Sequence, residues 1–159
     1  MVSGTRQIER IYVDTSVFGG YFDAEFELWT KILFDRIIEG RYRVIYSELI
    51  NIELTNAPER VKNLLFKLPN DAVEVVENSI EAADLADAYI QENVVGKTSL
   101  PDCNHIALAT LNDADILVSW NFKHIVNVNR IRGYNSVNIK LGHKILEIRS
   151  PREILDYEY

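Results

Sequence analysis

Three acidic residues stand at the boundaries of predicted structural elements, where carboxylates could gather around a cation. Asp14 directly follows the short apolar run at residues 11–13, Glu53 lies in the segment SELINIEL, and Asp102 lies near the start of SLPDCNHIALAT. None of the three is next to Lys or Arg in the sequence. Neighbouring carboxylates repel one another unless a hard cation lies between them. If the three meet in space, the expected occupant is Mg²⁺ or Mn²⁺.

Each acid also has a simpler interpretation, which the spacing leaves open. Asp14 could cap a turn or the next helix. Asp102 comes three residues after Ser99, close to the spacing of a capping box, and an acid near a helix start is stabilised by the helix dipole. Glu53 could be an ordinary surface residue. The elements around the three acids must therefore decide between these interpretations.

Strands and helices are predicted to alternate along the chain. The apolar and β-branched runs predict strands at residues 11–13, 43–46, 72–76, 116–120 and 145–148. Helical spacing predicts helices at 24–39 (ending at Gly40), from Ser47 to about 56, and at 58–68, 79–93, 101–112 and 125–141, with a short one beginning at 150–151. This order predicts one α/β domain over residues 1–159, with a mostly parallel sheet flanked by helices on both faces. In such a sheet the strand ends and the following helix starts share one edge, so the three acids can converge there.

The composition narrows the class of protein. The chain is 47% hydrophobic, with 24 acids against 17 bases and a net charge of -7. This balance is typical of a globular domain and argues against a broad basic nucleic-acid-binding face, but it allows a local metal-centred site. Cys103 is the only cysteine, so no internal disulfide forms and zinc binding at Cys/His spacing is not expected. With no signal-type segment and no membrane span expected, the sequence indicates a soluble cytoplasmic protein.

Four segments, in order, resemble the successive motifs of PIN-domain proteins, and most of all the VapC-type toxin branch. They are IYVDTSVFGGYF, YSELINIEL, PDCNHIALAT and ADILVSWNFKHI, and the resemblance spans residues 11–154. It implies a PIN-like domain with Mg²⁺-dependent ribonuclease activity, in which Asp14, Glu53 and Asp102 are the metal-binding and catalytic acids. Glu48 fits the second position less well, because the family places this Glu before a Leu.

The chain departs from the family pattern at the fourth acid. Asn121 stands at that position, where its amide oxygen can bind a cation or orient water but brings no charge. Asp115 is the nearest acid and enters the predicted strand at the opposite end. Asn121 is therefore the catalytic position on which activity is expected to depend.

The implied mechanism is metal-assisted hydrolysis, in which water attacks phosphorus in line with the leaving 3′-oxygen. Thr15 and Ser16 could hold a metal-bound water or a phosphate oxygen, or could simply form capping bonds. His105, one turn after Asp102, could contact substrate or pack beneath the site. Lys123, with His124, could meet the RNA backbone or lie on an ordinary surface. The same holds for Arg130, Arg132 and Lys140.

Two main function classes follow. The first is an endoribonuclease that is the toxin of a toxin–antitoxin pair, with RNA as substrate, an antitoxin protein as partner and a homodimeric state. The second is a PIN-like module that binds RNA or a protein without cutting, which Asn121 and the acidic balance favour. An aspartyl phosphotransferase fits less well, because Thr15 and Ser16 follow Asp14 where such enzymes carry a second Asp two residues on.

Overall fold

A five-stranded, all-parallel sheet forms the centre of the computed structural model, which describes residues 7–156. The strand order is β3-β2-β1-β4-β5. The strands are β1 (Glu9–Val13), β2 (Tyr42–Ser47), β3 (Val73–Val76), β4 (Ile116–Val118) and β5 (Glu147–Arg149). The predicted α/β class with a parallel sheet is confirmed.

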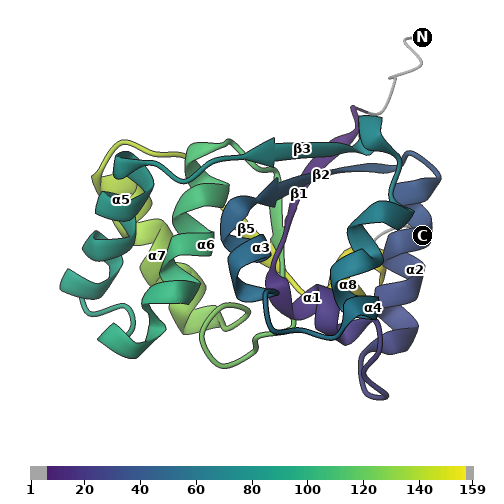
Figure 1. Cartoon of the computed structure of the whole chain (residues 1–159). Coiled ribbons are helices and arrows are strands. Elements are labelled where there is room, and N and C mark those ends of the chain that lie inside the picture. Colours follow the sequence, from purple (N-terminus) through teal and green to yellow (C-terminus); the bar gives the residue numbers. More distant parts are fainter. Residues whose placement is uncertain (1–6, 157–159) are drawn as a thin grey trace, which may run out of the picture.

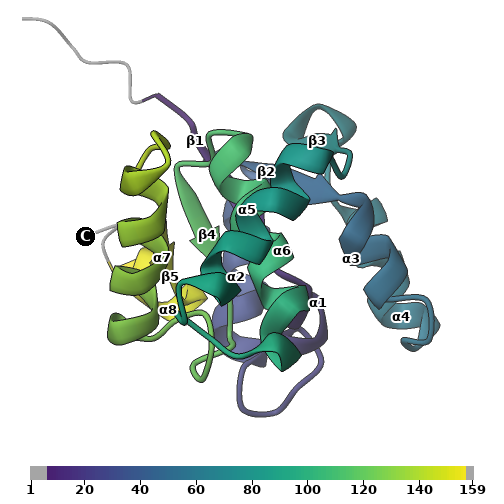
Figure 2. The ribbon, with the colours of Figure 1, turned by 90° about the vertical axis from the view of Figure 1, so that its left-hand side faces the viewer.

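Helices cover both faces of this sheet, as predicted. Figure 1 shows α5 (Ile80–Gln91), α6 (Leu100–Leu111) and α7 (Val128–Lys140) on one side, and α2 (Glu27–Ile38) and α8 (Pro151–Asp156) on the other. In Figure 2, α5, α6 and α7 lie in front of the sheet. Three shorter helices, α1 (Thr15–Gly20), α3 (Glu48–Glu53) and α4 (Glu59–Lys62), complete the α-helices of the described residues.

Strand β1 is the central strand, and the side of the sheet on which later strands are added changes at β1. From β1 the chain adds β2 and then β3 on one side, and later adds β4 and β5 on the other. Ile11, Tyr12 and Val13 are at most 1% exposed, as expected for a strand covered on both faces. In open α/β sheets, ligands bind beyond the carboxyl ends of the strands at this switch point. Asp14 is the first residue beyond β1.

The helix α1 was not predicted, because Gly19 and Gly20 have low helix propensity. It forms because Asp14 caps its first turn and because Val17 and Phe18 are buried beneath it. Packing also requires glycine at position 20, because a Cβ there would lie 2.8 Å from two ring atoms of Trp120. Close packing thus overrides local preference.

Several predicted boundaries were wrong. The helix expected from Ser47 to about 56 ends at Glu53, and the one expected over 58–68 divides into α4 and the 3-10 helix η1 (Asn63–Lys67). Two more 3-10 turns, η2 (Asn70–Ala72) and η3 (Lys97–Ser99), precede β3 and α6. The helix expected at 125–141 begins only at Val128, because Asn127 caps it. The predicted end of the α2 helix at Gly40 is confirmed, since the φ of +84° at Gly40 is the left-handed conformation that glycine adopts at low cost.

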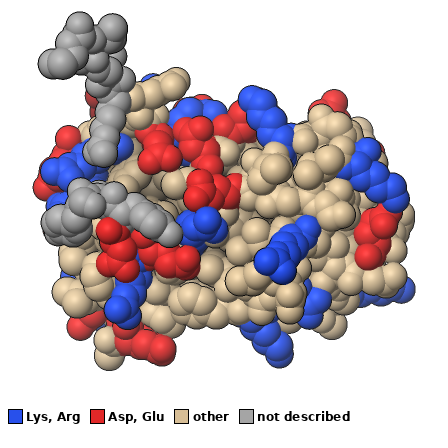
Figure 3. All heavy atoms as spheres, turned by 180° about the vertical axis from the view of Figure 1, so that it is seen from behind, with Lys and Arg blue, Asp and Glu red and all other residues tan. Residues whose placement is uncertain are grey.

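The surface carries mixed charge on the face opposite to that of Figure 1. Figure 3 shows Lys and Arg scattered among acidic and neutral residues there, rather than gathered into one basic surface. Within residues 7–156, no helix is long and apolar enough to span a membrane.

Candidate active site

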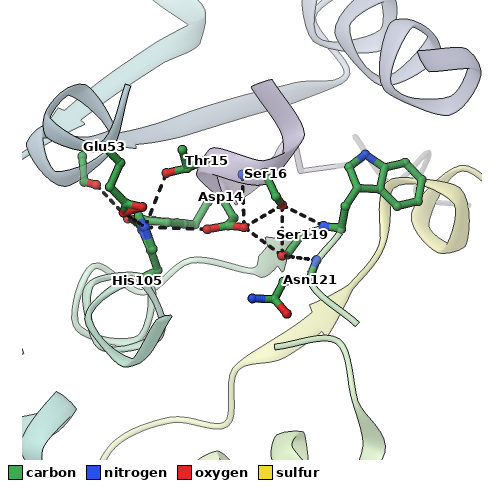
Figure 4. Close-up of polar contacts among 10 residues, drawn as sticks. Asp14, Thr15, Ser16, Glu53, His105, Ser119 and Asn121 are labelled. Carbon is green, nitrogen blue, oxygen red and sulfur yellow. Dashed lines mark hydrogen bonds and ion pairs between the residues drawn. The ribbon is translucent and has the colours of Figure 1, made fainter. Parts of the chain in front are cut away.

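The carboxylate of Asp14 lies at the centre of a polar cluster beyond β1 and β4 (Figure 4). Its Oδ2 accepts hydrogen bonds from the hydroxyls of Ser16, at 2.7 Å, and Ser119, at 2.8 Å. The backbone N–H of Ser16 lies 3.4 Å from the same oxygen and completes the N-cap of α1. The capping interpretation of Asp14 is therefore correct, but it uses one oxygen only. Among the described residues, Oδ1 has no hydrogen-bond donor.

Parallel pairing of β1 with β4 brings Ser119 to Asp14. Val13 is paired with Val118, and the backbone N–H of Asp14 donates to the carbonyl of Val118 at 3.0 Å. The residues that follow each strand are therefore neighbours. Sequence reasoning missed Ser119, although a hydroxyl residue just after an apolar strand was a usable signal.

His105 lies on the other side of Asp14, between the carboxylates of Asp14 and Glu53. Its Nε2 is hydrogen-bonded to Oε1 of Glu53 and lies 3.7 Å from Oδ1 of Asp14. The other ring nitrogen, Nδ1, lies 2.6 Å from the hydroxyl of Tyr12. The ring is 1% exposed, so His105 lies beneath the site rather than at its surface. This placement matches the packing alternative for His105.

Charges within this cluster shift the pKa values of two groups. Burial alone lowers the pKa of the His105 imidazole, but the hydrogen bond to Glu53 and the charges of Asp14, Glu53 and Asp102 outweigh burial and raise it. The pKa of Asp102 is raised, first by burial and then by the charge of Asp14, although His124 and His105 act in the opposite direction. The charge of Asp14 therefore opposes the ionisation of Asp102.

Asp102 has no hydrogen-bond or ion-pair partner in the part of the chain that the structure describes, residues 7–156, although its side chain is partly buried. A partly buried carboxylate with a raised pKa beside a second carboxylate favours cation binding. Asp102 and Asp14 are therefore the carboxylates that would hold a divalent cation if one binds here.

Glu53 is placed differently from the other two acids. Its carboxylate is paired with His105, and its side chain is 29% exposed. Consistent with this pairing, no group of three or more His, Cys, Asp or Glu residues arranged to hold a metal ion occurs between residues 7 and 156. The structure thus brings Glu53 to the site but separates it from Asp14 by an imidazole.

Asn121 has a role inside the protein. Its side-chain oxygen accepts a hydrogen bond from the backbone N–H of His124 at 3.0 Å, and its own N–H donates to the Ser119 hydroxyl at 2.9 Å. Asn121 therefore fixes the turn after β4 and the hydroxyl that bonds Asp14. In Figure 4 it lies on the Ser119 side of Asp14, away from Glu53.

The remaining predicted contact residues are distributed around the cluster. The hydroxyl of Ser16 donates to Asp14 and accepts from the N–H of Trp120 at 3.0 Å, so it is occupied within the protein. The Thr15 hydroxyl lies 3.5 Å from Nε2 of His105. Lys123 is exposed.

The two alternative acids lie outside the cluster. Glu48, the less favoured second acid, is exposed at the start of α3. The Asp115 carboxylate accepts a hydrogen bond from the backbone N–H of Arg10 at 2.8 Å.

Two of the basic residues considered for RNA binding, and the single cysteine, have other surroundings. Lys140 forms an ion pair with Glu92 at 2.5 Å, and the Arg130 guanidinium donates to the carbonyl of Val94. Cys103 is fully buried, and burial together with the charge of Asp102 raises the pKa of its thiol to about 12. The thiol therefore stays protonated and unreactive near neutral pH.

Comparison with solved structures shows which known fold this is. One match is a chain in the crystal structure of VapBC2 from Rickettsia felis bound to a DNA fragment from their promoter, with a TM-score of 0.52 and 12% identity over 89% of this chain and 98% of that chain. A second is a chain of DNA-bound VapBC from Salmonella typhimurium, with a TM-score of 0.50 and 15% identity over 90% of this chain and 98% of that chain. No protein-family model and no curated protein matches the sequence.

These likenesses confirm the predicted fold, a single α/β, PIN-like domain similar to a chain of the VapBC complexes. At 12% and 15% identity they show the fold alone. The chemistry must be argued from the site itself.

Proposed function

We propose that the protein is a Mg²⁺- or Mn²⁺-dependent endoribonuclease, the toxin of a toxin–antitoxin pair. The observation that carries the proposal is the pair of carboxylates at the switch point of the sheet. Oδ1 of Asp14 has no hydrogen-bond donor within residues 7–156 and lies 3.7 Å from Nε2 of His105, and Asp102 has no hydrogen-bond or ion-pair partner there, yet both groups lie in a partly buried cluster. Two such carboxylates are a binding site for a hard cation.

Each residue of the cluster has a separate role in the proposed reaction. Asp14 and Asp102 hold the cation, and Ser16 and Ser119 keep the Asp14 carboxylate in one orientation through its other oxygen. A bound divalent cation supplies Lewis-acid polarisation of the scissile phosphate and lowers the pKa of water. Glu53, held by His105, orients the attacking water and takes up its proton.

The proposed reaction is hydrolysis of an RNA phosphodiester. Water forms a new bond to phosphorus as the bond to the 3′-oxygen breaks, and the leaving oxygen takes a proton. The products carry a 5′-phosphate and a 3′-hydroxyl. In this scheme Asn121 contributes no charge and serves to hold Ser119 and the following turn.

Cleavage of a fluorescent single-stranded RNA by the purified protein tests the proposal. We expect cleavage with Mg²⁺ or Mn²⁺, none with a chelator, and loss of cleavage in Asp14→Asn and Asp102→Asn. Asp84→Asn is the matched control, because Asp84 is an exposed acid on α5. The proposal fails if the wild type does not cleave, or if Asp14→Asn cleaves as well as the control.

A non-cleaving binding module is the second candidate, and one observation favours it. Asn121 brings no charge where the family pattern has an acid, and its amide oxygen is already bonded to the His124 N–H. Calorimetric titration with Mn²⁺ separates the two functions. Absence of Mn²⁺ binding together with tight, metal-independent RNA binding would establish the binding module.

Protein partners form a further part of the proposal. The similar solved structures are VapBC complexes, which supports an antitoxin-type partner for this chain. The segments predicted as helices at 24–39 and 58–68 carry exposed apolar side chains, among them Leu28 and Phe66, which are 62% and 81% exposed. We propose that these segments form a homodimer, which light scattering of the purified protein would detect as twice the chain mass.

A further inference from the structure

A chain of buried polar groups runs beneath the proposed active site. The hydroxyl of Tyr12 lies 2.7 Å from the Ser47 hydroxyl and 2.6 Å from Nδ1 of His105. The opposite nitrogen of the same ring is bonded to Glu53. Tyr12 and Ser47 are 0% exposed and His105 is 1% exposed, so neither solvent nor substrate reaches them. Glu53 is the only member of this chain that faces the site.

The donors and acceptors in this series of hydrogen bonds, from Ser47 to Glu53, can be assigned. A carboxylate only accepts, so Nε2 of His105 carries the hydrogen toward Glu53. The Tyr12 phenol has one proton to donate and an oxygen that accepts, and it lies within hydrogen-bond distance of both Ser47 and His105. Tyr12 therefore bridges Ser47 and the imidazole, and each ring nitrogen of His105 has a partner. The ring cannot rotate without leaving a buried polar group unpaired.

Glu53 has little else to hold it in place. It is the last residue of α3, a six-residue helix in which Ile50 is the buried side chain and whose first turn lacks a side-chain cap. A glutamate at such a helix end would otherwise sample several rotamers. The bond to a buried imidazole restricts the Glu53 carboxylate to one place, with the His105 ring between it and Asp14.

From this arrangement we infer that Tyr12 and Ser47 are positioning residues that act through His105 on the Glu53 carboxylate. The inference rests on the proposed function, because it assigns Glu53 a part in RNA hydrolysis. Outer hydrogen-bond partners at metal sites change activity by about 10–100-fold when removed, and Tyr12 lies two contacts from Glu53, through His105. Tyr12→Phe should therefore lower kcat by about 10–100-fold and leave KM within about twofold.

A double-mutant cycle distinguishes positioning from a structural role. If Tyr12 acts through Glu53, then Tyr12→Phe combined with Glu53→Gln should lose no more activity than Glu53→Gln alone. Tyr89→Phe is the matched control. Tyr89 is also 0% exposed, and its hydroxyl donates to Asn138 at 2.5 Å, outside the Ser47–Tyr12–His105–Glu53 chain. Tyr89→Phe should keep kcat and, combined with Glu53→Gln, should change nothing further.

A second readout does not depend on activity. The ¹⁵N chemical shifts of the His105 ring report the hydrogen bonds at each nitrogen. Tyr12→Phe and Ser47→Ala should move the Nδ1 resonance, Glu53→Gln should move that of Nε2, and Tyr89→Phe should move neither. If Tyr12→Phe fails to fold, Ser47→Ala carries both the kinetic and the spectroscopic test.

The outcomes separate this inference from the proposed function. A wild type that cleaves RNA, with losses in Tyr12→Phe and Glu53→Gln that do not add, supports the positioning role. A wild type that cleaves while Tyr12→Phe and Ser47→Ala retain full kcat overturns the inference and leaves the proposed function intact. So do losses that multiply in the double variant. A wild type that cleaves no RNA overturns the proposed function and the positioning role together.

Discussion

Ser119 donates a hydrogen bond to Oδ2 of Asp14 at 2.8 Å, joining the residues that follow two neighbouring parallel strands. The same Ser119 hydroxyl accepts from the N–H of Asn121 at 2.9 Å. This pair therefore ties the turn after β4 to the carboxylate at the end of β1. It leaves Oδ1 of Asp14 without a hydrogen-bond donor among the described residues, on the side of the carboxylate that lies 3.7 Å from Nε2 of His105.

Ser119→Ala should destabilise the protein by about 1.5–3 kcal/mol, because a hydrogen bond to a buried carboxylate is lost. Ser119 itself is 0% exposed, so water does not replace the bond. Urea denaturation measures the loss in the free energy of unfolding. Ser119→Thr keeps the hydroxyl and should recover most of the stability; an alanine variant as stable as the wild type would contradict the role of this bond.

Asp102→Asn should raise the melting temperature at neutral pH while it abolishes cleavage. Folding raises the pKa of Asp102, through burial and the charge of Asp14, so its ionised form costs free energy in the folded state. That cost is absent below the unfolded pKa of about 3.9, grows as pH rises through the unfolded and folded values, and is complete above the folded value. The gain from Asp102→Asn should therefore shrink as pH falls toward about 4.

Scanning calorimetry at several pH values checks this prediction, with Asp84→Asn as the exposed control. Mn²⁺ should raise the melting temperature of the wild type and leave that of Asp102→Asn unchanged, because a ligand that binds the folded state stabilises it. A neutral-pH melting temperature below that of the wild type would show that the Asp102 carboxylate stabilises the fold instead.

Gly20→Ala should destabilise the protein by about 1–3 kcal/mol, because the added methyl group overpacks the contact between α1 and Trp120. The new Cβ would lie 2.8 Å from the Trp120 ring and 3.1 Å from the Thr30 hydroxyl, to which the Trp120 N–H is bonded. Gly19→Ala is the matched control. Nothing lies within 4 Å of a Cβ at Gly19, so that change should stabilise α1 by about 0.5–1 kcal/mol. Equal effects of the two substitutions would contradict the packing account.

The sequence was sufficient for the acids whose positions follow from strand order. Asp14 directly follows an apolar strand, and Asp102 lies at the start of a helix that leads into the next parallel strand, so the start of that helix lies at the edge where the strands end. The parallel sheet with helices on both faces follows from the same alternation.

Other features of the site depend on tertiary contacts that no local pattern encodes. The bond between His105 and Glu53 requires α6 and α3 to meet, and nothing in either segment specifies their separation. Tyr12 was predicted only as part of an apolar strand, since a tyrosine hydroxyl gives no sequence signal of its partner. The α1 helix was missed because two glycines disfavour it locally, while the Asp14 cap and the packing against Trp120 stabilise it in the fold.

The most direct test of the central claim is a crystal structure of the wild type with Mn²⁺, read from the anomalous signal of the metal. We expect a manganese ion bound by Oδ1 of Asp14 and the carboxylate of Asp102, with Glu53 still hydrogen-bonded to His105, and no ion in Asp14→Asn. Crystals that show no manganese at these two carboxylates, or the same ion in Asp14→Asn, would contradict it.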